Sequence, residues 1–139
     1  MKFSTKTRYG LRAMMEIAIA EPGTGVFQKD IAKNQDISVK YLDHIIAGLK
    51  AKELITNYKG KKSGYTLCRK AKDISVLDIH RAFEPSICVI DCLSRTVSCD
   101  RESHCAAKGF WGQLNQQIIE YFKSVNLQQI VDDQSLLDD

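Results

Sequence analysis

The strongest constraint on the fold is a pair of helical segments joined by a tight turn within residues 28–52. Residues 28–34 have the pattern of a short helix, and residues 35–37 form the turn. Ser38 then caps a longer helix that runs to about Lys52, because a serine hydroxyl accepts hydrogen bonds from the free N–H groups of a first turn. The apolar positions of this second helix recur at the spacing of a core-facing stripe, and they are Leu42, Ile45, Ile46 and Leu49. Two helices joined by so short a turn have the shape of a helix-turn-helix.

The segments on either side complete a winged form of this unit. A helix over residues 4–20 comes first and ends at residues 21–23, where proline disfavours helical backbone before it and glycine permits a turn. Downstream, β-prone runs at residues 54–58 and 65–68 flank a basic loop bracketed by glycines, which is the pattern of a hairpin. We therefore predict a mainly α fold with a small β-hairpin wing, a winged helix-turn-helix followed by a long helix.

The second half of the chain is predicted to be helical at both ends with an irregular middle. Ser75 begins a helix with a capping-box pattern, and residues 86–105 look irregular and hold four of the five cysteines. A long amphipathic helix follows over residues 106–125, and a shorter helix lies around residues 127–131. The apolar residues along one side of the long helix are Phe110, Leu114, Ile118, Tyr121 and Phe122.

The 139 residues are enough for one domain, which we divide into four parts. Residues 1–72 are the winged helix-turn-helix, 73–105 a helix and a cysteine-rich loop, 106–131 the long helix and the C-terminal helix, and 132–139 an acidic tail. The basic N-terminus does not match an export signal, because Glu16 interrupts its apolar stretch. No apolar run approaches the roughly 20 residues of a membrane span. We therefore expect a cytoplasmic protein, and in that reducing compartment cysteines are thiols or ligands rather than disulfides.

Charge is divided unevenly along the chain. Residues 1–72 have fifteen Lys/Arg and six Asp/Glu, a net charge of +9, whereas residues 73–139 have five and eleven, a net charge of −6. A basic half is typical of a nucleic-acid binder, because its cations meet phosphates. A solvated basic face is the alternative on charge alone.

A recognition helix reads base edges with its N-terminal residues. Here Lys40 suits a phosphate or a guanine, and the Asp43 carboxylate suits the amino group of cytosine. Arg12 is a further candidate for contact with the DNA backbone. Each side chain is also compatible with a solvated surface, which is the favoured interpretation for His44. The residues predicted to contact DNA are Arg8, Ser38, Lys40, Tyr41, Asp43, His44, Lys59, Lys61 and Lys62.

Three cysteines, Cys92, Cys99 and Cys105, are separated by six and five residues. Three soft thiolates on one loop are typical ligands of an iron–sulfur cluster or of zinc. Zinc sites usually pair cysteines closely, and only Cys88 and Cys92 form such a pair, so the spacing favours a cluster over zinc. Uncoordinated thiols are the remaining alternative. Cys68 alternates within a predicted strand, which favours a small core residue.

A cysteine enzyme is disfavoured. His104 adjoins Cys105, but neighbours on a helix point about 100° apart and do not face each other. The sequence shows neither an Asn or Asp placed to orient the imidazole nor a glycine-rich oxyanion motif. We therefore predict that the protein is not an enzyme.

Four motifs together resemble the IscR/NsrR/CymR-type family of bacterial winged-helix regulators. They are residues 4–14, Ile37-Ser38-x-x-Tyr41-Leu42, Gly60-x-x-x-Gly64-Tyr65 and the three-cysteine loop, in the family's order over nearly the whole chain. The resemblance implies a homodimer held by the helix at residues 106–125 and a pseudo-palindromic double-stranded DNA operator. It also implies an iron–sulfur cluster on Cys92, Cys99 and Cys105. Family members sense cluster supply, nitric oxide, redox state, iron or cysteine status.

The sequence departs from the family at the fourth ligand. Lys108 and Arg8 stand where related regulators have a histidine or an aspartate ligand. The first gap between the cysteines is one residue longer than the family's, and Ser63 replaces a wing glycine. A 2Fe-2S cluster is favoured over a 4Fe-4S cluster. The fourth ligand stays open among His104, Cys88, Asp91, Glu102 and a ligand from the partner subunit.

These patterns predict a dimeric DNA-binding transcription regulator that senses redox, iron or nitric oxide status through its cluster. One alternative is a cluster-free regulator of the same fold that senses thiol or cysteine status or a protein partner. The other is a zinc-stabilised DNA-binding module. The metal and sulfide content of the protein distinguishes these possibilities. Iron with acid-labile sulfide indicates the cluster, neither of the two indicates the cluster-free regulator, and zinc alone indicates the zinc-stabilised module.

Overall fold

The computed structural model describes residues 2–21, 24–59, 64–90, 93 and 104–138. These stretches are mainly helical with one two-stranded antiparallel sheet, as the sequence predicts. None of their helices is long and apolar enough to cross a membrane. In chain order the elements are α1 (Thr5–Ile19), α2 (Gln28–Gln35), α3 (Val39–Ala51), β1 (Ile55–Asn57), β2 (Tyr65–Leu67), the short 3-10 helix η1 (Ala71–Asp73), α4 (Val76–Arg81), α5 (Ala106–Ser124) and α6 (Leu127–Asp138).

α2 and α3 form the predicted helix-turn-helix. Asp36 lies between them in the left-handed region with φ of 53°, a conformation that aspartate tolerates better than most side chains. The Ile37 N–H donates to the Ala32 carbonyl at 2.9 Å and closes the turn. Ser38 caps α3, and its Oγ accepts from the Tyr41 N–H at 3.1 Å. The start of α3 is therefore fixed by local hydrogen bonds.

The core forms around α1, which packs against α2, α3, α4 and α6. Met14, Leu42 and Leu49 are fully buried in it. Phe83 follows α4 and lies against a glycine on α3: a Cβ on Gly48 would be 2.7 Å from its ring. Glycine is needed there because the ring occupies the volume that a side chain would fill.

The wing is shorter than predicted but has an additional partner. β1 pairs with β2 in the register Ile55↔Leu67, and each strand has three residues instead of the predicted four or five. Val26 forms an antiparallel bridge to Tyr65 with two backbone hydrogen bonds, both 2.9 Å long. Gly64 has φ of 131°, and a Cβ there would be 2.8 Å from the Val26 carbonyl carbon. The chain before α2 is thereby attached to the base of the wing.

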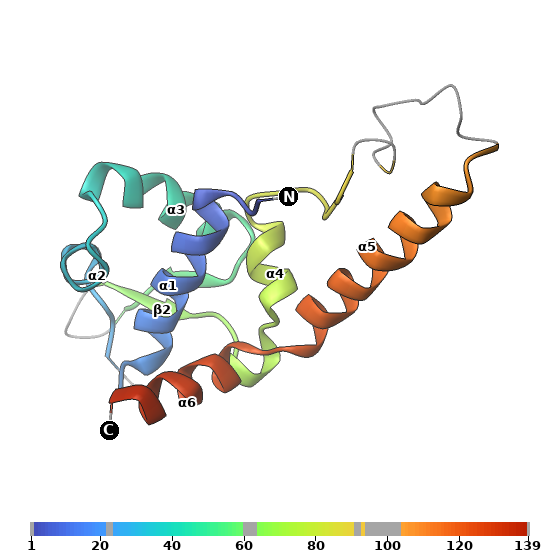
Figure 1. Cartoon of the computed structure of the whole chain (residues 1–139). Helices are drawn as coiled ribbons and strands as arrows, with labels where there is room; N and C mark the ends of the chain where they lie inside the picture. The colour runs from blue at the N-terminus through green and yellow to red at the C-terminus, as the bar shows by residue number, and fades with distance from the viewer. Residues whose placement is uncertain (1, 22–23, 60–63, 91–92, 94–103, 139) are drawn as a thin grey trace.

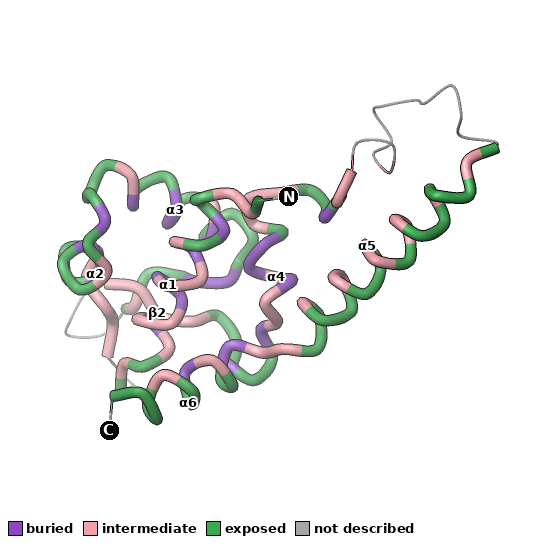
Figure 2. Tube along the Cα trace, viewed as in Figure 1, coloured by how far each residue is buried: buried purple, intermediate pink, exposed green. Residues whose placement is uncertain are grey.

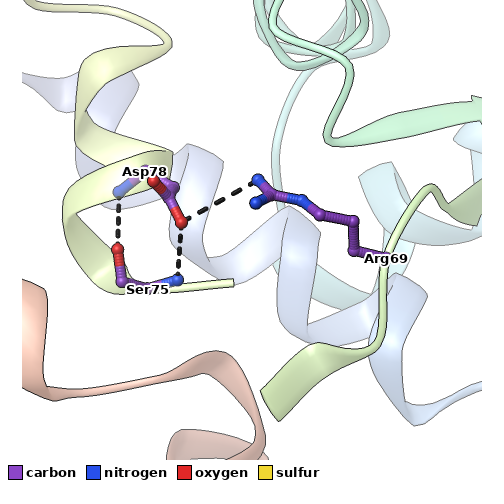
Figure 3. Close-up of polar contacts among 3 residues, drawn as sticks. All are labelled: Arg69, Ser75 and Asp78. Atoms are coloured by element: carbon purple, nitrogen blue, oxygen red, sulfur yellow. Dashed lines mark hydrogen bonds and ion pairs between the residues drawn. The ribbon is translucent and has the colours of Figure 1, made fainter. Parts of the chain in front are cut away.

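α4 begins with the capping box that the sequence predicts (Figure 3). The Ser75 Oγ accepts from the Asp78 N–H at 3.0 Å, and the Asp78 carboxylate accepts from the Ser75 N–H at 2.9 Å. Arg69 approaches the same carboxylate at 3.8 Å. This ion pair contributes little stability because both side chains are more than one-third exposed.

The N-terminal part of α5 projects away from the other described elements, whereas the helix contacts α4 (Figure 1), and α5 has no buried residue (Figure 2). Two of its aromatic side chains, Phe110 and Tyr121, are 61% and 68% exposed. α6 then returns along α1 and buries Leu127 and Val131.

α6 is longer than the sequence indicates, because it continues to Asp138 rather than ending near residue 131. Residues 132–138 of the predicted acidic tail are therefore helical. Two hydrogen bonds between residues four apart support this extension, from Gln128 to Asp132 at 2.8 Å and from Gln134 to Asp138 at 3.0 Å.

Candidate nucleic-acid interface and cysteine loop

The first half of α3 presents a polar face to solvent. Ser38, Lys40, Asp43 and His44 are exposed, and Tyr41 is half-buried. The apolar stripe of the same helix faces the core, so burial fixes which side chains point outward. A helix whose exposed first turns are polar apart from Val39 has the shape and chemistry to enter the major groove of B-DNA.

The Asp43 carboxylate has a partner that the sequence does not indicate. Gln28, the first residue of α2, donates from Nε2 to the Asp43 Oδ1. The same nitrogen lies 3.3 Å from the Val39 carbonyl and donates to it as well. No local spacing relates Gln28 to Asp43, so only the packing of α2 on α3 reveals the contact.

α1 braces the turn of the helix-turn-helix. The Arg12 guanidinium donates from Nε to the Gln35 Oε1 at 2.8 Å and lies 4.9 Å from the centroid of the Tyr9 ring. The Tyr9 ring meets the Tyr41 ring edge to face at 5.8 Å. Arg12 is half-buried in these contacts, whereas Arg8 is exposed and its guanidinium donates only to the Thr5 hydroxyl at 3.3 Å among the described residues. Arg8 is therefore the better placed of the two arginines for a phosphate.

The wing is only partly described. Lys59 is exposed, and Lys61 and Lys62 lie outside the described residues.

The prediction that Cys68 is a core residue is wrong, because its side chain is exposed. β2 ends at Leu67, so the strand alternation that favoured an inward side chain does not reach Cys68.

The cysteine loop is described only at its ends. Cys92 and Cys99 lie outside the described residues. Cys105 is a half-exposed free thiol at the start of α5, His104 is exposed, and Cys88 is an exposed free thiol. Within the described stretches, no three histidine, cysteine or acidic side chains come together as a metal site would require.

An asparagine attaches the start of this loop to α5. The Val89 N–H donates to the Asn115 Oδ1 at 2.8 Å, and the Asn115 Nδ2 donates to the Ile87 carbonyl at 2.7 Å. Ile87 itself is buried. One side chain on α5 thereby pairs with the backbone on both sides of Cys88, much as a neighbouring strand would.

A buried histidine joins α4, α1 and α5. His80 is 3% exposed, and its Nδ1 is 3.1 Å from the Thr7 Oγ1. Its ring meets Phe3 and Phe122 edge-on at 5.6 and 5.8 Å. Burial lowers the pKa of His80, since desolvation penalises the charged ring more than the nearby Glu84 carboxylate favours it. The imidazole is therefore neutral at pH 7.

Comparison with known proteins places this arrangement in a family. The Rrf2 family model, described as an iron-dependent transcriptional regulator, matches residues 3–133. The protein called Rrf2 from Nitratidesulfovibrio vulgaris is 35% identical over 98% of this chain and 91% of its own length. The HTH-type transcriptional regulator IscR of Photorhabdus laumondii is 28% identical over 99% of this chain and 84% of its own length.

Solved structures of regulators have the same architecture. IscR of T. potens superposes with a TM-score of 0.78 at 30% identity, covering 96% of this chain and 88% of that one. CymR, the global cysteine regulator of B. subtilis, superposes with a TM-score of 0.77 at 27% identity, covering 95% and 97%. The winged-helix fold predicted from the sequence is confirmed by these likenesses.

Proposed function

Because the chain belongs to the Rrf2 family of transcription regulators, which are not enzymes, we propose that it binds a pseudo-palindromic DNA operator as a homodimer. We propose further that an iron–sulfur cluster sets its affinity for that operator. The observation that carries the DNA-binding part is the exposed polar start of α3, with Ser38, Lys40, Asp43 and His44. Lys59, Lys61 and Lys62 of the wing and Arg8 of α1 would contact phosphates on either side.

The dimer proposal is supported by α5. None of its nineteen residues is buried, and its N-terminal part projects from the rest of the described chain, although Phe122 near its other end packs on His80. An amphipathic helix of this length needs an apolar surface to pack against, and a second copy offers one with matching aromatic residues. A two-fold dimer presents two α3 helices, which is why the operator would be pseudo-palindromic.

The cofactor proposal rests on the donor set of the cysteine loop. Cys92, Cys99 and Cys105 would hold the cluster, since thiolates are the ligands that such clusters use. Cys105 is half-exposed and forms no disulfide among the described residues, so its thiol is accessible to a cluster. When bound, the cluster would supply covalent links among the three thiolates and a sensitivity to oxidants. We propose 2Fe-2S, with 4Fe-4S as the alternative and the fourth ligand still to be assigned, His104 being one candidate.

The described residues provide a physical route from the loop to α3. Asn115 attaches the start of the loop to α5, and Phe122 on α5 packs on His80, which bonds Thr7 on α1. α1 in turn holds α3 through the contact of Tyr9 with Tyr41. A coupling of about 1–3 kcal/mol along this route would change operator affinity about 5–150-fold.

A cluster-free regulator of the same fold is the second candidate. The superposition on CymR, a cysteine regulator, supports it, and so do the exposed free thiols of Cys68 and Cys88. In this case the thiols or a bound protein would carry the signal. A zinc-stabilised module is the third candidate, and it rests only on the Cys88 and Cys92 pair.

Anaerobic purification from iron-replete cells tests the proposal. The expected result is a brown protein with iron and acid-labile sulfide in equal amounts, two of each per chain for 2Fe-2S and four for 4Fe-4S. A colourless protein that also fails to take up iron and sulfide on reconstitution contradicts the cofactor proposal. Zinc alone would favour the third candidate. Sedimentation of the same sample tests the dimer.

A further inference from the structure

Gln28 holds the carboxylate of Asp43, a residue on the outward face of α3. The Gln28 side chain reaches across from the first turn of α2 and donates from Nε2 to the Asp43 Oδ1 and to the Val39 carbonyl. Both hydrogen bonds of this amide nitrogen are thus made to α3. Asp43 is exposed, whereas Gln28 is half-buried. Among the described residues no hydrogen bond joins the other oxygen, Oδ2, which is therefore available to a ligand.

The contact orients Asp43 without neutralising it. An amide donor satisfies one carboxylate oxygen but adds no positive charge. Among the described residues, no lysine or arginine forms an ion pair with Asp43. The carboxylate thus has an amide partner but no counter-ion among the described residues, and its other oxygen has a defined direction instead of sampling several rotamers.

A fixed, charged acceptor on a recognition helix discriminates between base edges. Cytosine presents an amino donor in the major groove, whereas guanine presents two acceptors and thymine an acceptor and a methyl group. A carboxylate held in one orientation attracts the first and repels the others. A carboxylate free to rotate can turn toward water or toward the amino group of a neighbouring adenine, and it discriminates less.

We propose that Gln28 is a specificity-determining positioning residue, which holds Asp43 so that each half-site prefers cytosine at the base opposite that carboxylate. This inference rests on the proposed function and adds a residue outside α3 to the reading of the operator. Gln28 acts through Asp43 rather than by contact with the base.

Selection from a pool of duplexes with a randomised centre tests the inference without knowledge of the operator. Wild type, Gln28→Ala, Asp43→Ala and the double variant are each selected at the same salt concentration. Wild type is expected to enrich one motif with a cytosine in each half-site. Asp43→Ala is expected to lose about tenfold or more of that preference, which corresponds to the loss of one good base contact.

Gln28→Ala is expected to lose preference at the same base and at no other. The double variant is expected to match Asp43→Ala, because Gln28 has no effect once the carboxylate is gone. Gln128→Ala is the matched control: it removes an exposed glutamine amide that donates to Asp132 at 2.8 Å on α6, and it is expected to leave the motif unchanged. The salt dependence of binding to the enriched motif should be the same for Gln28→Ala as for wild type, since no phosphate contact is removed.

Three results would overturn the inference. The first is that Gln28→Ala enriches the same motif as wild type, and the second is that it weakens preference evenly at every base, as a distorted helix-turn-helix would. Asp43→Ala retaining the cytosine would show that this carboxylate does not read the base. In all three cases DNA binding itself stands, whereas enrichment of no motif by the wild type would contradict the proposed function and this inference together.

Discussion

Replacing Asn115 by alanine tests how firmly the cysteine loop is attached to α5. The side chain makes two hydrogen bonds to the backbone at Ile87 and Val89, of 2.7 and 2.8 Å. A hydrogen bond contributes a net stabilisation of about 1 kcal/mol, so the variant should weaken this attachment by about 2 kcal/mol. At a factor of ten per 1.4 kcal/mol, local opening becomes roughly 25-fold more frequent.

Amide hydrogen exchange of the cluster-free protein measures that opening directly. The Val89 amide loses its acceptor in Asn115→Ala and should exchange at least roughly 25-fold faster than in wild type, while the amides of the buried core around Met14 should change little. Gln116→Ala is the control on the neighbouring residue, because within the described stretches its side-chain amide bonds only the exposed Glu120, at 2.8 Å. Unchanged exchange at Val89, or equal acceleration in both variants, would refute the attachment.

Three further perturbations address the core, the buried histidine and the wing. Gly48→Ala should destabilise by about 1–3 kcal/mol in urea unfolding, because the new Cβ meets the Phe83 ring at 2.7 Å; a neutral or stabilising effect would mean that the ring moves freely. The folded state lowers the pKa of His80 below its usual 6.5, so the unfolded chain binds more protons as the pH falls below 6.5. The free energy of unfolding should therefore fall on acidification through that value, and His80→Gln should flatten the fall in urea titrations across pH; an unchanged slope would contradict the assignment. Changing Lys61 and Lys62 to alanine should reduce the slope of log K against log salt by about 1.8, and an identical slope in fluorescence anisotropy would remove both from the interface.

Elements fixed by local chemistry were predictable from the sequence. Ser38 and Ser75 each cap a helix as expected, because an N-cap needs only its own side chain and the next turn. The hairpin was predictable for the same reason, since Gly64 and the β-prone runs are close neighbours in sequence.

Contacts between distant segments were not predictable. The bonds of Gln28 to Asp43 and of Asn115 to Ile87 join residues 15 and 28 positions apart, and no periodicity marks them. The burial of His80 likewise depends on Phe122, which lies on another helix and packs against the imidazole ring. The length of α6 was missed because its last residues, including Leu136 at 74% exposure, have no buried face to signal a helix.

The prediction for the second strand of the wing was wrong at its end, because the strand is shorter than the sequence pattern indicates. Alternation along residues 65–68 placed Cys68 inside, but β2 stops one residue earlier and the side chain is exposed. Its N–H still donates to the Leu54 carbonyl at 3.0 Å, so the backbone stays attached while the side chain turns outward.

A paired titration tests the central claim most directly. One anaerobic preparation is divided, and its affinity for the selected duplex is measured by fluorescence anisotropy at fixed salt, with the cluster present and after its removal. We predict a difference between about 5-fold and 150-fold, and no difference between the two treatments for Cys99→Ala. Equal affinities in both states, in a protein shown to contain iron and sulfide, would contradict the proposal that the cluster controls DNA binding.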